Sequence, residues 1–164
     1  MRVRFPVLVL GLLLMPVSTC SDGPKPTTRR NPPARHVVVA PEQLAWKFIL
    51  PGTEMAVVSG DPDKKGGIYV IRIRTKGEVA VRPHWHPTEE HVTVLEGSFS
   101  MAHGDTYDAS KLIELKPGAH SVVPAKMPHF GFHKAGNVIE IFGEAPFAIN
   151  WVNPEDDPNR PKGK

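Results

Sequence analysis

Two histidines separated by one residue, with a glutamate shortly after them, are the residues of this chain best placed to do chemistry. His84, His86 and Glu90 form a run of the type H-x-H-x-x-x-E, and His129 ends a later proline-containing segment, residues 124–129. Side chains at positions i and i+2 of a strand point to one face, so the two histidines of the run can meet at one point. Three neutral imidazoles and one carboxylate suit a divalent first-row metal and leave positions open for water or substrate. We therefore predict a site for one divalent ion, with Fe, Mn, Ni and Zn all remaining candidates.

Two nearby residues remain alternatives to this ligand set. Glu89 would replace Glu90 if the turn after His86 differs by one residue. His133 lies four residues after His129, so on a straight strand it shares that face and can act as a substitute ligand or a pocket residue. Without a metal, the set would be solvated strand histidines, which are ordinary surface residues. The other histidines are predicted to be structural or exposed: His36, His91, His103 and His120.

Short strands separated by turn signals must position these residues. Residues 68–74 alternate apolar and charged side chains, which is the pattern of a half-buried strand. Residues 41–48, with a proline at the start, predict a short helix, and residues 108–112 predict one helical turn. Many short strands at regular spacing indicate a sandwich or a barrel. Further strands are expected at residues 55–58, 79–86, 90–95, 98–102, 120–123, 129–133, 137–142 and 147–151.

The spacing of these residues resembles the two motifs of the cupin superfamily. The segment from Gly77 to Gly97 contains the H-x-H-x-x-x-E run and resembles the first motif, while the segment from Gly118 through Pro124 to His129 resembles the second. The resemblance spans residues 55–152, and parts of this range are similar to small, exported, single-domain bacterial cupins. It implies an all-β fold, a double-stranded β-helix (jelly-roll) barrel with the short helix before it. The metal ligands that it implies are His84, His86, Glu90 and His129.

Three positions depart from the usual cupin pattern. Lys126 stands where the second motif usually has glycine, and His133 stands where it usually has asparagine. Six residues lie between Gly77 and His84, whereas five is usual in the first motif. These departures concern turns more than ligands, so the predicted metal site is kept.

A metal held by three histidines and a glutamate leaves about two positions open if it is octahedral. We expect a metal-dependent enzyme, of dioxygenase type or using Lewis-acid chemistry, acting on a small oxygenated metabolite that chelates the metal. Glu90 would remain a ligand or serve as the catalytic base. The alternative is a non-catalytic metal- or ligand-binding sensor at the cell envelope. A metal-free epimerase ranks third, and four apolar strand residues are candidates to line the cavity: Phe99, Met101, Phe132 and Phe142.

The N-terminal segment has the pattern of an export signal. Arg2 and Arg4 precede an apolar stretch of about 13 residues, which is too short for a membrane-spanning helix. Residues 1–20 are therefore predicted to be a signal peptide, with a lipid anchor at Cys20 as the alternative to ordinary cleavage. The protein would be periplasmic or a membrane-anchored lipoprotein. Cys20 is the only cysteine, so a disulfide scaffold and a thiolate metal site are excluded.

The remaining chain divides into three predicted parts. Residues 21–35 read as a flexible tether, residues 36–152 as a single cupin domain, and residues 153–164 as an irregular tail. The net charge of +3 at pH 7 comes partly from the N-terminal segments, and the basic residues lack interleaved aromatics, so nucleic-acid binding is not expected. The expected partners are a small-molecule ligand or substrate and, by the cupin resemblance, a second copy of the chain in a homodimer.

Overall fold

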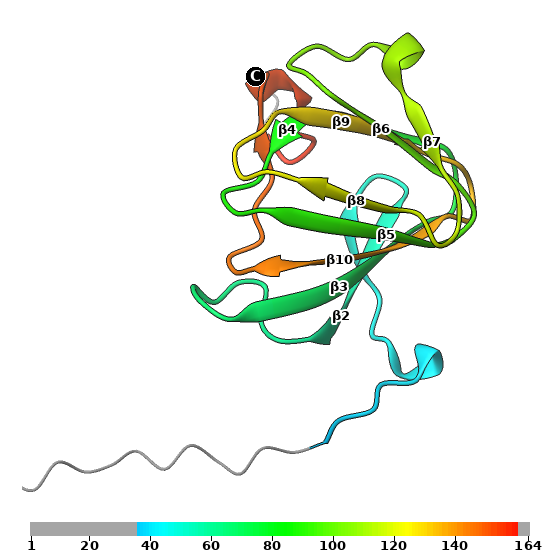
Figure 1. Cartoon of the computed structure of the whole chain (residues 1–164), viewed down its shortest axis with the longest axis vertical. Coiled ribbons are helices and arrows are strands. Elements are labelled where there is room, and N and C mark those ends of the chain that lie inside the picture. Colours follow the sequence, from blue (N-terminus) through cyan, green and yellow to red (C-terminus); the bar gives the residue numbers. More distant parts are fainter. Residues whose placement is uncertain (1–35, 161–164) are drawn as a thin grey trace, which may run out of the picture. The chain divides into compact units, whose positions relative to one another are not determined.

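The computed structural model describes residues 36–160, which form two antiparallel sheets (Figure 1). The six-stranded sheet has the order β1-β2-β3-β10-β5-β8, and the five-stranded sheet has the order β11-β4-β9-β6-β7. The strands are β1 (Lys47–Leu50), β2 (Thr53–Ser59), β3 (Ile68–Thr75), β4 (Val79–Trp85), β5 (Glu90–Glu96), β6 (Phe99–His103), β7 (Ile113–Leu115), β8 (His120–Val123), β9 (His129–His133), β10 (Val138–Glu144) and β11 (Asn150–Trp151). Three short 3-10 helices complete the chain: η1 (Pro41–Gln43), η2 (Ala109–Lys111) and η3 (Pro154–Asp156). This is the all-β jelly roll that the sequence predicts.

The core lies between the two sheets and follows from strand alternation. In β3, Ile71 and Ile73 are buried while Arg72 and Arg74 point outward. The outward arginines pair with carboxylates on neighbouring strands, as in the 2.9 Å contact between Arg72 Nε and Glu140 Oε2. Burial of the inward row contributes most of the stability, because each fully buried aliphatic side chain is worth about 1.5–3 kcal/mol.

Pairing between distant segments brings the predicted ligands together. β4 and β9 are antiparallel neighbours, and His84 lies directly opposite His129 in their register. The register shifts between Val81 and His84, at Pro83. Such irregularities re-aim side chains, and proline is tolerated where the ladder is already interrupted. The end of β4 is thereby bent where it presents its histidines.

The predicted helix over residues 41–48 is wrong beyond its first turn. η1 stops at Gln43, Leu44 is already extended, and β1 begins at Lys47 and pairs with β2. Pairing with β2 outweighs the weak helical preference of a short segment, and aromatic and β-branched residues such as Phe48 and Ile49 suit a strand. The helical turn predicted at residues 108–112 is confirmed as η2. The sequence missed β1 and β7, and the strand predicted at residues 147–151 is reduced to β11.

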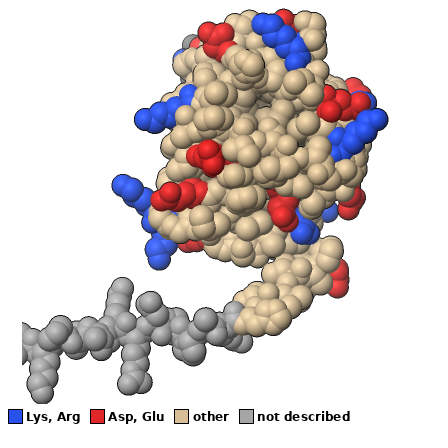
Figure 2. All heavy atoms as spheres, viewed as in Figure 1, with Lys and Arg blue, Asp and Glu red and all other residues tan. Residues whose placement is uncertain are grey.

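The predicted signal peptide, Cys20 and the tether lie outside the described residues. Within residues 36–160, no helix has the length and apolar character required to cross a bilayer. The predicted tail is described up to Arg160 and contains η3. On the face drawn in Figure 2, basic and acidic side chains of the described residues are interspersed rather than separated by sign.

One exposed residue has a backbone conformation that suggests a stabilising substitution. Lys126, in the turn before β9, has a φ of 63° and donates its N–H to the His86 carbonyl at 2.8 Å. This left-handed region costs an L-residue about 1–2 kcal/mol, and glycine offsets part of the gain with about 0.5–1 kcal/mol of chain entropy. We expect Lys126→Gly to raise the free energy of unfolding by about 0.5–1 kcal/mol in urea titrations. Lys126→Ala should give no gain, and a loss in the glycine variant would contradict this reasoning.

Candidate metal centre

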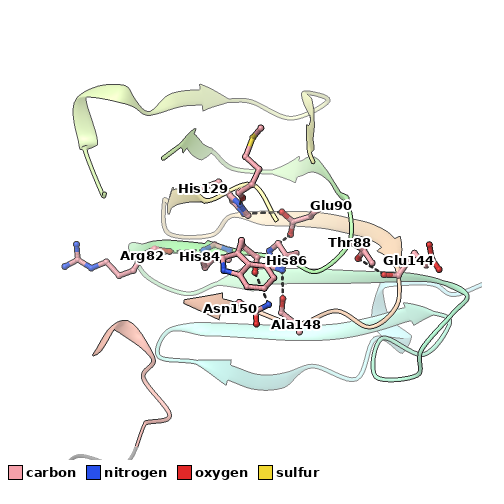
Figure 3. Close-up of polar contacts among 11 residues, drawn as sticks. Arg82, His84, His86, Thr88, Glu90, His129, Glu144, Ala148 and Asn150 are labelled. Atoms are coloured by element: carbon pink, nitrogen blue, oxygen red, sulfur yellow. Dashed lines mark hydrogen bonds and ion pairs between the residues drawn. The ribbon is translucent and has the colours of Figure 1, made fainter. Parts of the chain in front are cut away.

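Four predicted ligands meet at one end of the jelly roll. His84 lies near the end of β4 and His86 just after it, Glu90 begins β5, and His129 begins β9. All four are buried, with exposed fractions of 4–6%. One ring nitrogen from each histidine lies within 4.8 Å of the other two. Figure 3 shows these side chains gathered at one place, His84 and His86 from the end of β4 and the others from β5 and β9.

Each histidine of the cluster is anchored through its Nδ1 atom. The partner is a backbone carbonyl in every case, and a carbonyl can only accept a hydrogen bond. Nδ1 must therefore carry the hydrogen, and in a neutral ring the Nε2 lone pair is left free for a ligand. The three contacts are His84 to Arg82 O at 2.8 Å, His86 to Ala148 O at 2.8 Å and His129 to Met127 O at 3.1 Å.

The Glu90 carboxylate faces two of these rings. Its Oε1 is 3.3 Å from His86 Nε2, and its Oε2 is 3.4 Å from His129 Nε2. Both nitrogens of His86 and both of His129 thus face acceptors, although a neutral imidazole has one N–H. A positive charge resolves this conflict, and it can come from protonated rings or from a metal ion.

Burial disfavours the protonated rings. Burial, reinforced by the neighbouring rings of His129 and His86, lowers the pKa of His84 to about 3. Burial also lowers the pKa of His86, whose Nε2 makes no hydrogen bond within the described residues and lies 3.3 Å from Glu90 Oε1. Burial by itself would raise the pKa of Glu90, but its contact with His129 and the other imidazole rings around it outweigh burial, so this pKa is lowered. An ionised carboxylate facing imidazole nitrogens fits a divalent cation.

Neither of the two alternative ligands, Glu89 and His133, belongs to the histidine cluster. Glu89 points outward, with 55% of its side chain exposed, and contacts His91 Nε2 at 3.0 Å. His133 is buried but lies at the other end of β9, where its Nδ1 contacts Asn137 Oδ1 at 2.7 Å. Burial lowers the pKa of His133 as well. Glu89 is therefore directed away from the histidine cluster, and His133 is a cavity residue outside it.

The cluster opens onto an apolar cavity between the sheets. About 60 Å³ is open to water-sized molecules, which is room for roughly four to six waters. Of the four apolar candidates, Phe99 and Met101 line this cavity, whereas Phe132 and Phe142 do not. Phe142 lies on the other face of its strand, stacked on His91 with ring centroids 4.3 Å apart.

An outer pocket, with about 320 Å³ open to water-sized molecules, adjoins the cavity. The two share Ile49 and Leu50 of β1 and Phe147 and Ile149 of the loop before β11. These four side chains form the boundary that a ligand would cross. Phe147 also stacks on the His86 ring, with centroids 5.0 Å apart. Sequence reasoning missed these boundary residues, because no local pattern reports which loop closes a barrel.

Comparison with known proteins identifies the family. The family described as the ChrR cupin-like domain matches residues 34–137, and no curated protein matches the chain. Among solved structures, the polyketide cyclase RemF from Streptomyces resistomycificus is 20% identical, with a TM-score of 0.61 over 76% of this chain and 90% of its own. An RmlC-like cupin from Shewanella frigidimarina NCIMB 400 is 17% identical, with a TM-score of 0.54 over 68% of this chain and 91% of its own. The DMSP lyase DddQ from Ruegeria pomeroyi DSS-3 is 15% identical, with a TM-score of 0.54 over 70% of this chain and 64% of its own.

At these identities the solved structures establish the shared fold alone. The family match covers more than half of the chain and runs to the turn before β10, so it includes all four predicted ligands. The chain belongs to the ChrR cupin-like family of the cupin superfamily.

Proposed function

We propose that this chain is an exported, metal-dependent cupin enzyme acting on a small oxygenated metabolite. One divalent ion would be held by His84, His86, Glu90 and His129. Three imidazoles and a carboxylate accept Fe, Mn, Ni or Zn, so the donor set does not select among them. Two of the structural neighbours, RemF and DddQ, are named as enzymes, which supports catalysis as a use of this fold and leaves the reaction open.

A single observation carries the metal proposal. His86 and His129 each place one ring nitrogen against a backbone carbonyl and the other against the Glu90 carboxylate. Burial opposes placing a proton on His86 to satisfy both contacts. A cation held by these imidazoles and the carboxylate would satisfy every contact at once, and burial would strengthen its binding.

The chain's own residues would act on a bound ligand in three ways. The apolar walls around Phe99 and Met101 exclude water from the reacting group. The Nδ1 anchors hold the imidazoles in one orientation, so they need no reorganisation during reaction. Glu90 is the one carboxylate lining the cavity within the described residues, and it is the group that can accept a proton from the ligand. The metal, when bound, would supply Lewis-acid polarisation of a ligand oxygen or activation of dioxygen.

A second candidate function is non-catalytic metal or ligand sensing. The small open volume of about 60 Å³ favours this alternative, because small-molecule sites commonly measure about 300–1,000 Å³. The two functions differ in turnover. We would load the full chain with Fe, Mn, Ni or Zn in turn and follow oxygen uptake and product formation with diketones, catechols and hydroxy acids. Binding without turnover in every case would favour the sensor.

Glu90→Gln is expected to weaken metal binding without abolishing it. The amide keeps one oxygen at the site but removes the negative charge, and losses of about 10- to 100-fold are typical of such changes around a metal. Competition titration with a chelating dye measures the affinity. Glu89→Gln is the matched control, since that side chain points away from the cluster, and it should retain the parent affinity. Equal weakening in the two variants would contradict the assigned role of Glu90.

Export and dimer formation are parts of the proposal that rest on residues 1–20 and on the cupin resemblance. Fractionation of cells that express the full chain tests the first part, with recovery in the periplasm or membrane as the expected result. Recovery in the cytoplasm would exclude export. Loss of membrane association in Cys20→Ser would support the lipid anchor, and sedimentation of the purified chain gives its oligomeric state.

A further inference from the structure

One buried hydroxyl in the cavity has no hydrogen-bond partner among residues 36–160. Thr53 begins β2 and is 4% exposed, and its Oγ1 makes no hydrogen bond with any described residue. Thr53 lines the same cavity as the metal cluster. A buried polar group without a partner is costly, so its presence in an otherwise apolar wall requires an explanation.

His133 is the other polar residue of the cavity outside the cluster. The Asn137 amide donates through Nδ2 to Glu96 O at 3.0 Å, which fixes the amide orientation and leaves Oδ1 facing His133 Nδ1 at 2.7 Å. Nδ1 of His133 therefore carries the hydrogen, and Nε2 is an acceptor. Phe99 holds the ring by stacking, with centroids 4.5 Å apart.

Backbone pairing places Thr53 and His133 at the same end of the cavity. Thr53 lies opposite Thr75 in the β2–β3 register, and the Thr75 hydroxyl donates to the carbonyl of Lys134 at 3.0 Å, one residue beyond His133. The metal cluster is at the opposite end, because His129 begins β9 and His133 ends it. Four residues of strand span about 13 Å between Cα atoms.

We propose that Thr53 and His133 form a second polar subsite, which binds a hydroxyl group on a ligand whose other end reaches the metal. An alcohol can donate to His133 Nε2 and accept from the Thr53 hydroxyl, so both groups are satisfied. A carboxylate is disfavoured, because a neutral His133 offers it no donor at Nε2. The inference rests on the proposed function and narrows its substrate class to oxygenated metabolites with a neutral hydroxyl separated from the chelating group by an apolar segment.

Paired hydroxamates test the subsite without knowledge of the natural ligand. The full chain is loaded with zinc, and calorimetry compares alkanohydroxamates of two to six carbons with their ω-hydroxy counterparts. Both series bind zinc through the hydroxamate. At one chain length the terminal hydroxyl is expected to tighten binding about five- to tenfold, as one or two net hydrogen bonds would. The ¹⁵N resonance of His133 Nε2 should shift with the hydroxylated ligand alone.

Thr53→Val removes the hydroxyl while keeping the side-chain shape. It should abolish the hydroxyl preference, leave the plain hydroxamates within about twofold, and not lower the melting temperature, because no hydrogen bond is lost. Thr75→Val is the matched control: it loses the bond to the Lys134 carbonyl, so it should lower the melting temperature but keep the preference.

The hydroxamate experiment distinguishes failure of the subsite from failure of the proposed function. Hydroxamates that bind with no hydroxyl preference at any length would overturn the subsite and leave the metal function intact, and a preference that survives Thr53→Val would also overturn it. Hydroxamates that fail to bind zinc-loaded protein at all would overturn the proposed ligand function, and the subsite with it.

Discussion

His84→Ala and His129→Ala should each remove most of the metal from the purified full chain. The affinity is expected to fall by at least about 100-fold, the upper end of losses seen when a supporting residue rather than a ligand is removed. The reason is geometric. Each ring enters from its own strand and is anchored by its own carbonyl, so removal of either ring leaves the site one protein ligand short. Elemental mass spectrometry of protein purified without added metal or a histidine tag gives the content per chain.

The control for this experiment is a histidine on the outer face. His120 contacts Thr93 Oγ1 at 2.8 Å and is exposed, so His120→Ala removes an imidazole without touching the cluster. It should retain the parent metal content. Full metal content in both His84→Ala and His129→Ala would sink the proposed site, and equal loss in His120→Ala would show that the bound metal lies on the surface.

The part of the site that the sequence could predict is the part set by strand periodicity. His84 and His86 share a face because strand side chains alternate, and Glu90 points inward for the same reason while Glu89 points outward. His129 was predicted from its proline-containing segment and from the motif resemblance. Its pairing opposite His84 joins residues 45 positions apart in the sequence, a separation that local patterns do not report. The fold class followed from the same short, evenly spaced strands.

The rest depends on tertiary contacts. The carbonyl that anchors His86 belongs to Ala148, in the loop before β11. No pattern in the sequence around His86 or around Ala148 predicts this contact. β1 formed in place of the predicted helix because β2 offers it backbone partners. Thr53 could not be recognised from the sequence as a site residue, since threonine is common at the start of a strand. Only the structure shows that its hydroxyl is buried without a hydrogen-bond partner among the described residues.

Acid should destabilise the metal-free protein well before its carboxylates titrate. Burial lowers the pKa of His84 to about 3 and lowers the pKa values of His86 and His133. In the unfolded chain a histidine titrates near about 6.5. Below that pH the histidines of the unfolded state bind protons, whereas those of the folded state stay neutral. Their contribution to the free energy of unfolding is therefore present above about pH 6.5 and is lost as the pH falls toward the folded pKa values.

The expected loss of stability can be calculated over this pH range. One histidine that stays neutral in the fold costs about 1.4 kcal/mol per pH unit, so His84 alone should remove about 2 kcal/mol between about pH 6.5 and 5. His86 and His133 act in the same direction. Glu90 has a lowered pKa, so its contribution is lost only at lower pH, below the ordinary range of a glutamate, and it does not enter this window.

Urea titrations of chelator-treated protein at pH 7, 6 and 5 measure how the free energy of unfolding changes with pH. His84→Phe should reduce the slope of the unfolding free energy against pH by the equivalent of about one proton bound on unfolding. Thr75→Val should lower stability at every pH and leave this slope unchanged, because it removes no titrating group. A flat profile in the parent protein would mean that the cluster histidines accept protons in the fold. The positive charge facing Glu90 could then be carried by protons, and the argument that these contacts require a metal would lose its basis.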